Sequence, residues 1–321
     1  MLRYIIKRLL NLIPVILIIS MILFGVSKLM PGDPVLLLMP QGGQAFKSAE
    51  ARQQTYDQLK KQYGFDKSIP EQYVGWLTRT LQGNLGESTK YRRPVTQVIG
   101  TPLKNTLILN IGVSIISFFL SVWIGIKSAV NPGGFFDQFF QVFSLAGISL
   151  PTFFFGIFLI FAFALQLGWL PAGGMPRYGT LGEWIKTLIL PTITLTIGSL
   201  ASTSRYVRTS MLEALSQDYI RTARAKGLSE RKVIYSHAFR NALIPVVTVV
   251  AWSFTGLLGG AAITETIFAY EGIGKYLIDS VLSYDYSLLM ALNMLYAILS
   301  VAANLIMDIG YSLVDPRVRL E

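Results

Sequence analysis

Residues 9–29 read LLNLIPVILIISMILFGVSKL, and this apolar run decides the fold class. It is long enough to cross the hydrocarbon core of a bilayer, which takes about 20 residues. Arg3, Lys7 and Arg8 precede it, as basic residues precede the apolar region of a signal peptide. That region is only about 7–15 residues long and ends at a small-residue cleavage site, whereas this run ends in Lys28-Leu29-Met30-Pro31. We therefore expect a retained first membrane helix.

Five more apolar stretches follow, at residues 106–126, 139–167, 187–204, 242–264 and 288–307. Helix is the expected state of each, because lipid offers no partner for free backbone N–H and C=O groups. Pro151 and Pro191 fall within these stretches and are tolerated in membrane helices. The stretch 139–167 is long for one span, so we expect it to be tilted or to extend beyond the bilayer. The sequence predicts an all-α polytopic membrane protein with six transmembrane helices.

The composition agrees with a membrane protein. Of 321 residues, 52% are hydrophobic and 14% are charged, whereas soluble proteins carry about 25% charged residues. The formal net charge of +10 would suit nucleic-acid binding only if the basic residues gathered on a soluble surface. They flank apolar stretches instead, so we expect membrane lipid and no nucleic acid as their partner. The absence of cysteine excludes disulfides, thiolate metal sites and a cysteine nucleophile.

Basic residues are unevenly shared between the loops. They are frequent at the two termini and in the loop after the fourth stretch: Arg3, Lys7, Arg8, Arg205, Arg208, Arg221, Arg224, Lys226, Arg231, Lys232, Arg240, Arg317 and Arg319. The opposite side offers Arg177, Lys186 and Lys275. The positive-inside rule therefore places both termini and the loop 205–242 in the cytoplasm.

This orientation predicts four parts along the chain. They are a cytoplasmic amino terminus with the first span (1–29), an extracytoplasmic segment (30–104), a core of five spans (105–312) and a cytoplasmic tail (313–321). The extracytoplasmic segment is also basic, but it exceeds about 60 residues, and segments of that length escape the rule.

The segment 30–104 carries two helix signals. Ser48 can cap a helix through about Tyr63, with Gly64 as its left-handed stop. Residues 70–81 read as a second short helix with Tyr73, Trp76 and Leu77. The segment is either a small cap on the membrane interface or a docking platform for a soluble partner, and both interpretations stay open.

The loop 205–242 contains a helix, a stop and a second helix. Ser216 or Asp218 can cap a helix through about Lys226, and Gly227 stands where a left-handed terminator is needed. Ser229 can cap a second helix that runs to about Asn241, before Pro245 enters the fifth span. A short helix fixed between two spans can transmit a push from a soluble partner, although an ordinary amphipathic loop would have the same pattern.

The residues give no sign of catalysis. The run Gly272-Ile273-Gly274-Lys275 is not a phosphate loop, because Ala269 and Tyr276 occupy its required glycine and hydroxyl positions. His237 is the only histidine, and packing or helix capping is its expected role. The spans have no charged residue at their centres, which argues against an ion-coupled carrier. We therefore expect no enzyme activity, no metal site and no cofactor in this chain.

Two spans carry polar or small residues with open roles. Gly256 and Gly260 form a small-x-x-x-small pair in the fifth stretch, which favours close helix packing, including packing against a second subunit. The fourth stretch is rich in hydroxyl residues, namely Thr192, Thr194, Thr196, Ser199 and Ser202. They could line a polar path or could satisfy backbone groups near Pro191.

The loop also resembles a known signature. Residues 217–231, QDYIRTARAKGLSER, continued by 237–245, HAFRNALIP, are similar to the coupling loop of peptide-type permeases of ATP-binding-cassette (ABC) importers. The general importer signature begins Glu-Ala-Ala, where this chain has Arg221, Thr222 and Ala223. That signature ends in Leu-Pro. Here Leu243-Ile244-Pro245 takes this place and lies further from Gly227 than Leu-Pro lies from the glycine of the general signature. The peptide and nickel branch usually shows these departures.

Similar short motifs occur in order along nearly the whole chain. They are MPGDP at 30–34, YGFD at 63–66, YVGWL at 73–77, GNLGES at 83–88, ETIF at 265–268, GIG at 272–274, DY at 285–286 and DPRVR at 315–319. The chain resembles the first of the two permease subunits of dipeptide and oligopeptide importers, the one with the large outer segment.

The resemblance implies a type I ABC importer permease fold and half of a translocation pathway for di- or oligopeptides. The implied partners are a second homologous permease, two cytoplasmic ATPase subunits that bind ATP and Mg, and an extracytoplasmic substrate-binding protein. The implied location is the inner membrane of a bacterial or archaeal cell. The implied contact residues for the ATPase subunits are Asp218, Tyr219, Arg221, Thr222, Ala223, Arg224, Ala225, Lys226, Gly227 and Leu228.

Other functions remain as alternatives. Nickel chelates and glutathione are handled by similar permeases, and no residue here chooses among these substrates. A membrane scaffold that only docks a signalling protein and an ion-coupled carrier are the alternatives from other classes.

Overall fold

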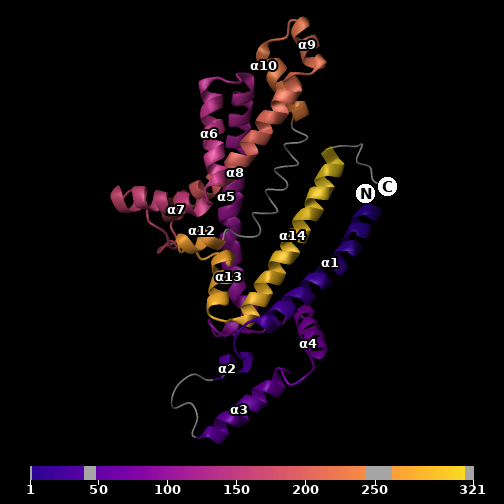
Figure 1. Cartoon of the computed structure of the whole chain (residues 1–321), viewed down its shortest axis with the longest axis vertical. Coiled ribbons are helices and arrows are strands. Elements are labelled where there is room, and N and C mark those ends of the chain that lie inside the picture. Colours follow the sequence, from indigo (N-terminus) through magenta and orange to yellow (C-terminus); the bar gives the residue numbers. More distant parts are fainter. Residues whose placement is uncertain (1, 40–47, 243–261, 315–321) are drawn as a thin grey trace. The chain divides into compact units, whose positions relative to one another are not determined.

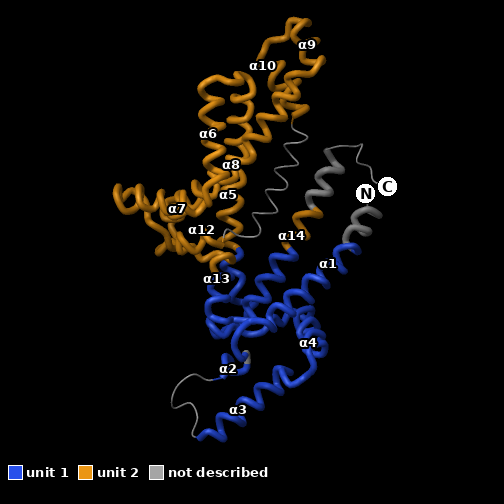
Figure 2. Tube along the Cα trace, in the orientation of Figure 1, with its two compact units in different colours: residues 1–103, 276–298 blue, residues 104–275, 299–321 orange. Residues whose placement is uncertain are grey.

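The computed structural model describes residues 2–39, 48–242 and 262–314, and these are mostly helical (Figure 1). The chain divides into two compact units (Figure 2). Unit 1 comprises Met1–Leu103 with Tyr276–Ile298, and unit 2 comprises Lys104–Lys275 with Leu299–Glu321. Three helices contribute residues to both units. They are α5 (Val95–Val130), α13 (Ile273–Leu282) and α14 (Tyr286–Val314).

Unit 1 begins with α1 (Leu2–Leu29) and continues through α2 (Pro34–Leu38), α3 (Ala49–Gln62), α4 (Ile69–Leu81), β1 (Glu87–Ser88) and β2 (Arg93–Pro94). The two strands pair antiparallel, with Glu87 opposite Pro94 and Ser88 opposite Arg93. Both predicted short helices are confirmed. The Ser48 hydroxyl accepts the Ala51 N–H at 3.2 Å, and Gly64 ends the first helix at φ +73°.

Aromatic side chains fix α4 against α1. The Phe24 ring lies 5.5 Å from that of Tyr73 and 5.9 Å from that of Trp76, measured between centroids. The hydroxyl groups of Ser20 and Tyr73 are 2.8 Å apart. Because Tyr73 and Trp76 are three positions apart, they share one face of α4, and this face packs on the last turns of α1.

Unit 2 contains most of α5, α6 (Phe135–Ser149), α7 (Thr152–Leu159), the π-helix η1 (Ile160–Gln166) and α8 (Leu181–Leu215). It continues with α9 (Asp218–Ala225), α10 (Glu230–Lys232), the π-helix η2 (Val233–Ala238) and α12 (Ala262–Ile267). The helix α8 packs against α5 and α6 through small residues. A Cβ on Gly125 would lie 2.5 Å from Val207 Cβ, and one on Gly147 would lie 2.8 Å from Ala201 Cβ. Close backbone approach therefore holds these three helices together.

The stretch 139–167 is not one tilted or extended helix, as the sequence had led us to expect. Residues 135–149 and 152–166 are helical, but they meet at an angle of 103°. Leu150 is extended, at φ −95° and ψ 136°, and Pro151 follows it. Proline has no N–H to donate and disfavours the helical conformation of the residue before it, so the helix breaks here. The helix α8 in contrast runs unbroken through Pro191.

Within the described residues, four helices are long and apolar enough to cross a membrane. They are Leu10–Leu29, Val95–Val130, Leu181–Leu215 and Tyr286–Leu305, and the bent pair would make a fifth. The polytopic, helical fold is thus confirmed, while six spans remain a prediction. Most of the fifth predicted stretch, with Gly256 and Gly260, lies outside the described residues.

Three of the hydroxyl residues that the sequence analysis named in α8 form hydrogen bonds within α8 or with α5. Thr194 is fully buried and donates to the Leu190 carbonyl at 2.8 Å. Ser199 accepts a hydrogen bond from Ser117 of α5 at 2.8 Å, and Ser202 donates to the Ser199 carbonyl at 3.1 Å. Thr196 Oγ1 in contrast is buried without a hydrogen-bond partner among the described residues, so these contacts do not decide between a polar path and the satisfaction of backbone groups near Pro191.

Candidate functional site

The helix α9 follows α8 after two residues, at one end of unit 2 (Figure 1). The predicted caps are wrong, since Gln217 holds the N-cap position and makes no side-chain bond there. Ser216 instead closes α8, and its hydroxyl donates to the Glu213 carbonyl at 2.8 Å. Asp218 is the first residue of α9, where a carboxylate interacts favourably with the helix dipole.

The predicted glycine stop is confirmed. Gly227 has φ +74°, and its N–H donates to the Arg224 carbonyl at 2.9 Å. A Cβ at this position would meet nothing within 4 Å. The left-handed backbone, rather than crowding, is therefore what favours glycine.

The second predicted helix is present in a different form. Ser229 holds the N-cap position of α10 but makes no side-chain cap bond, contrary to expectation. Its backbone carbonyl accepts the N–H groups of Lys232 and Val233. The helix then continues in π form from Val233 to Ala238, and residues 239–242 are helical again. Residue 242 is the last described residue of this stretch, so the predicted end near Asn241 stays a prediction.

The helix α9 has an inner and an outer face. On the inner face, Ile220 is 0% and Ala223 is 5% exposed. They belong to an apolar cluster with residues of α5, α8, η2 and the helical residues directly after η2: Ile126, Ala129, Val207, Met211, Ala214, Val233, Ala238 and Ala242. The small side chain of Ala223 therefore permits close approach of α9 to the chain's own helices.

The outer face carries the remaining predicted contact residues. Those that are exposed are Asp218, Tyr219, Arg221, Thr222, Arg224, Ala225, Lys226 and Gly227, whereas Leu228 is partly buried. Arg224 forms an ion pair with Glu230 across the Gly227 turn, with Nε 2.8 Å from Oε1. Both side chains are about half exposed, so this pair contributes little stability. The arrangement presents a polar, mainly basic surface on a helix whose other face is anchored.

An ion pair between α6 and α8 was missed by the sequence analysis. Asp137, in the first turn of α6, accepts from Arg208 of α8 in a bidentate contact of 2.6 Å (Nε to Oδ1) and 2.8 Å (Nη2 to Oδ2). The Asp137 side chain is fully buried, and it also accepts the Gly133 N–H at 2.9 Å. The signal was an isolated acid at the head of an apolar run, since such a group needs a cationic partner.

A second buried carboxylate organises the turn between α12 and α13. Glu265 is 0% exposed and accepts from the Thr106 hydroxyl at 2.8 Å and from the Lys275 N–H at 3.0 Å. A Cβ on Gly274 would lie 2.8 Å from Glu265 Oε2, and one on Gly272 would lie 2.5 Å from Oε1. The two glycines that superficially suggest a phosphate loop therefore make room for this carboxylate.

The same turn is held to the α5 segment of unit 2 by two further contacts. The Tyr270 hydroxyl donates to the Asn105 carbonyl at 2.8 Å, and the Asn105 amide donates to the Glu271 carbonyl at 2.8 Å. Burial raises the pKa of Tyr270, so its phenol stays protonated and able to donate.

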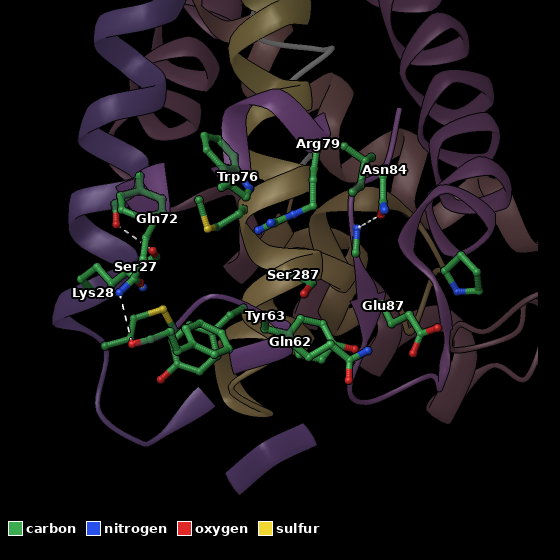
Figure 3. A pocket seen from close by; sticks show the side chains of 18 of the residues that line it. Ser27, Lys28, Gln62, Tyr63, Gln72, Trp76, Arg79, Asn84, Glu87 and Ser287 are labelled. Atoms are coloured by element: carbon green, nitrogen blue, oxygen red, sulfur yellow. Dashed lines mark hydrogen bonds between the residues drawn. The ribbon is translucent and has the colours of Figure 1, made fainter. Parts of the chain in front are cut away.

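Unit 1 has a pocket of about 500 Å³ (Figure 3). Its lining comes from the end of α1, from α3 and α4, from the hairpin and from the start of α14. Lys28 donates to Gln72 Oε1 at 2.5 Å and lies 5.0 Å from the Phe24 ring centroid. Arg79 and Glu87 also line it, and no ion pair joins Lys28, Arg79 or Glu87 to a described residue. The pocket thus offers both charges together with aromatic surface.

Glu71 and Tyr56, which lie outside the membrane-spanning helices of unit 1, have shifted pKa values. The hydrogen bonds from the Ser68 hydroxyl and backbone lower the pKa of Glu71, which closes the first turn of α4. The hydrogen bond to Asp33 raises the pKa of Tyr56 and ties α3 to the start of α2. Among the described residues, no group of His, Cys, Asp and Glu side chains is arranged to hold a metal ion.

Two family profiles match the chain. Residues 121–320 match the "binding-protein-dependent transport system inner membrane component", and residues 1–109 match the N-terminal part of such membrane components. The oligopeptide transport system permease protein AppB of Bacillus subtilis is 38% identical over 99% of both chains. The glutathione transport system permease protein GsiC of Pectobacterium atrosepticum is also 38% identical, again over 99% of both.

A solved structure has the same fold. It is an inward-facing form of the MetNI methionine ABC transporter, with a TM-score of 0.55 and 16% sequence identity. The match covers 68% of this chain and 97% of that chain.

Proposed function

This chain belongs to the family of binding-protein-dependent transport system inner membrane components, and from that premise we propose that it forms half of the translocation pathway of an ATP-driven importer of di- or oligopeptides. The single observation that carries the coupling role is the geometry of α9. Its inner face is buried against α5 and α8, and its outer face is exposed. A force applied to the outer face therefore acts directly on membrane helices.

The proposed assembly comprises this chain, a second homologous permease, two cytoplasmic ATPase subunits and an extracytoplasmic substrate-binding protein. The chain would span the inner membrane of a bacterial or archaeal cell six times, with both termini and the loop 205–242 in the cytoplasm. The basic residues of that loop support this orientation. The pairing with the second permease would use the fifth span, where Gly256 and Gly260 allow close packing.

In this mechanism, ATP hydrolysis takes place in the ATPase subunits, and this chain converts their movement into a change of membrane packing. Closure of the ATPase dimer draws the two coupling helices together, and the spans then rock between inward- and outward-facing states. The outer-face residues between Asp218 and Leu228 form the contact, whereas the predicted contact residue Ala223 is buried against the chain's own helices, and Gly227 is the turn that separates α9 from α10.

The outer segment, residues 30–104, would receive the substrate-binding protein. The support is the pocket of unit 1, which offers Lys28, Arg79 and Glu87 beside aromatic side chains. Lys28, Arg79 and Glu87 have no ion-pair partner among the described residues, so their charges are available to a docking protein. The packing of α4 on α1 also fits the alternative role of a membrane-interface cap.

Peptides are the proposed substrate because a relative that is 38% identical to this chain, AppB of Bacillus subtilis, is named an oligopeptide permease. Glutathione is a specific second candidate, because the relative from Pectobacterium atrosepticum is named a glutathione permease. Nickel chelates have no such support from these relatives. A binding protein outside this chain would select among the substrates.

The test is to extract the tagged chain gently from its native membranes and to assay the purified material for ATP hydrolysis. We expect a second permease and ATPase subunits to co-purify, and we expect peptide with its binding protein to stimulate ATP turnover. A chain that purifies alone, or with partners whose ATP turnover ignores every substrate, would favour the scaffold. Uptake by this chain alone in response to an ion gradient would favour an ion-coupled carrier.

A further inference from the structure

We propose that Asp137 and Arg208 are positioning residues that make α6 follow the movement of the coupling helix α9. This inference rests on the proposed function. It assigns a role to α6, which contributes no residue to the apolar cluster that buries the inner face of α9. The cluster is built by residues of α5, α8, α9 and the segment from Leu228 to Ala242. The ion pair links α6 to the helix that carries this cluster.

The contact has the geometry of a rigid joint. Both nitrogens that Arg208 uses donate to different oxygens of Asp137, at 2.6 and 2.8 Å. A bidentate guanidinium–carboxylate pair fixes orientation as well as distance. Asp137 is also held from its own side by the Gly133 N–H at 2.9 Å. Rotation or sliding of α8 against α6 would break at least one of these bonds.

The joint is continuous with the coupling helix. Arg208 lies in the last two turns of α8, directly after Val207, which belongs to the cluster that buries Ile220 and Ala223. A Cβ on Gly125 of α5 would lie 3.0 Å from the Arg208 backbone nitrogen. The end of α8 is therefore packed against both α5 and α9, and it can move only together with them.

The helix α6 in turn leads to a different part of unit 2. Beyond the 103° bend, α7 places Gly156 where a Cβ would lie 3.3 Å from Thr194 of α8 and 3.2 Å from Phe268. Phe268 follows the α12 helix, and its carbonyl accepts the Gly174 N–H at 2.7 Å. The Asp137–Arg208 pair thus connects α9, through the end of α8, to the bent helix pair α6–α7, and α7 in turn contacts Phe268 directly after α12.

The test uses the complete complex with its partner subunits in proteoliposomes, and it measures peptide uptake and ATP hydrolysis in the same preparation. Asp137→Asn and Arg208→Gln each leave one buried partner alone and could reduce the yield of folded protein. The double variant Asp137→Asn with Arg208→Gln removes both charges and so avoids that defect. Arg205→Gln is the matched control, because Arg205 is exposed on the same helix one turn away.

We expect the double variant to assemble at close to the wild-type level and to hydrolyse ATP, while peptides transported per ATP fall about three- to tenfold. Arg208→Lys keeps the positive charge without the bidentate contact. We expect its number of peptides transported per ATP to lie between those of the wild type and the double variant. Arg205→Gln should retain the wild-type ratio.

Two results would overturn the inference in different ways. A wild-type complex without ATP-dependent uptake would remove the proposed function and this inference with it. A wild-type complex that transports, together with a double variant that matches its number of peptides per ATP, would overturn the inference alone.

Discussion

Among the described residues of unit 2, two carboxylates are fully buried, Asp137 and Glu265, and they are satisfied in different ways. Asp137 meets the guanidinium of Arg208 from another long helix. Glu265 meets the hydroxyl of Thr106 and the backbone N–H of Lys275 at the turn before α13. The first carboxylate joins two helices through a side-chain pair, and the second fixes a turn through its backbone.

The difference indicates separate roles. Backbone donors hold Glu265 in one conformation of one turn, so its loss should unfold that turn. A side-chain pair joins two helices that are each folded without it, so its loss should leave the helices and change how they move together. The free energy of unfolding should therefore depend more on Glu265 and its turn. The coupling of ATP hydrolysis to transport should depend more on the end of unit 2 that contains Asp137, Arg208 and α9.

The largest effect on transport should come from Gly227→Asp, in the turn directly after α9. We expect peptide uptake to fall to background while membrane insertion persists, because aspartate at φ +74° is strained and adds a negative charge to a mainly basic contact surface. Uptake into proteoliposomes and the amount of membrane-extracted protein check this.

Gly64→Asp is the matched control for that variant, because Gly64 ends a helix at φ +73° in unit 1. It should retain uptake. Normal uptake by Gly227→Asp would contradict the coupling role of this turn.

Glu265→Leu should have the next largest effect, and on stability. It leaves the Thr106 hydroxyl and the Lys275 N–H without their acceptor, at a cost of about 2–5 kcal/mol in the free energy of unfolding. Thermal unfolding in detergent, followed by tryptophan fluorescence, measures the loss.

Glu271→Gln provides the comparison, since Glu271 is exposed in the same turn. If Glu265→Leu kept wild-type stability and lost only coupling, the division between the two carboxylates would be wrong.

A smaller effect should come from Gly125→Ala, which tests the packing beside Arg208. The new Cβ would lie 2.5 Å from Val207 Cβ, and overpacking of this kind costs about 1–3 kcal/mol. Gly112→Ala on the same helix meets nothing within 4 Å, so it should be neutral or stabilising by up to about 1 kcal/mol. Equal stabilities of the two variants would show that α5 and α8 do not approach closely.

Local features of the sequence predicted part of the local structure: both glycine stops and the Ser48 cap are present, whereas the predicted side-chain caps at Ser216 or Asp218 and at Ser229 are not. Gly64, Gly227 and the Ser48 cap act within one turn of their own positions, so their signals are complete in the sequence. Pro151 and Pro191 carry the same local signal, yet only Pro151 breaks a helix. Tertiary packing decides between these outcomes, and a single sequence does not contain that information.

The long-range parts of the site were out of reach for the same reason. Asp137 and Arg208 are 71 residues apart, and Thr106 and Glu265 are 159 apart. The sequence showed a glycine pair at 272 and 274, but the need for both glycines arises from a carboxylate folded against them. The contact helix could be predicted, while the residues that support it required the structure.

The most direct test of the central claim uses the absence of native cysteine. A photoactivatable crosslinker is attached to Tyr219→Cys on the exposed face of α9, and to Arg52→Cys on α3 as the control, within the ATP-hydrolysing complex. The account predicts an adduct with an ATPase subunit from Tyr219→Cys and none from Arg52→Cys. An ATPase adduct from Arg52→Cys, or none from Tyr219→Cys in an active complex, would contradict the claim that α9 is where the ATPase subunits act.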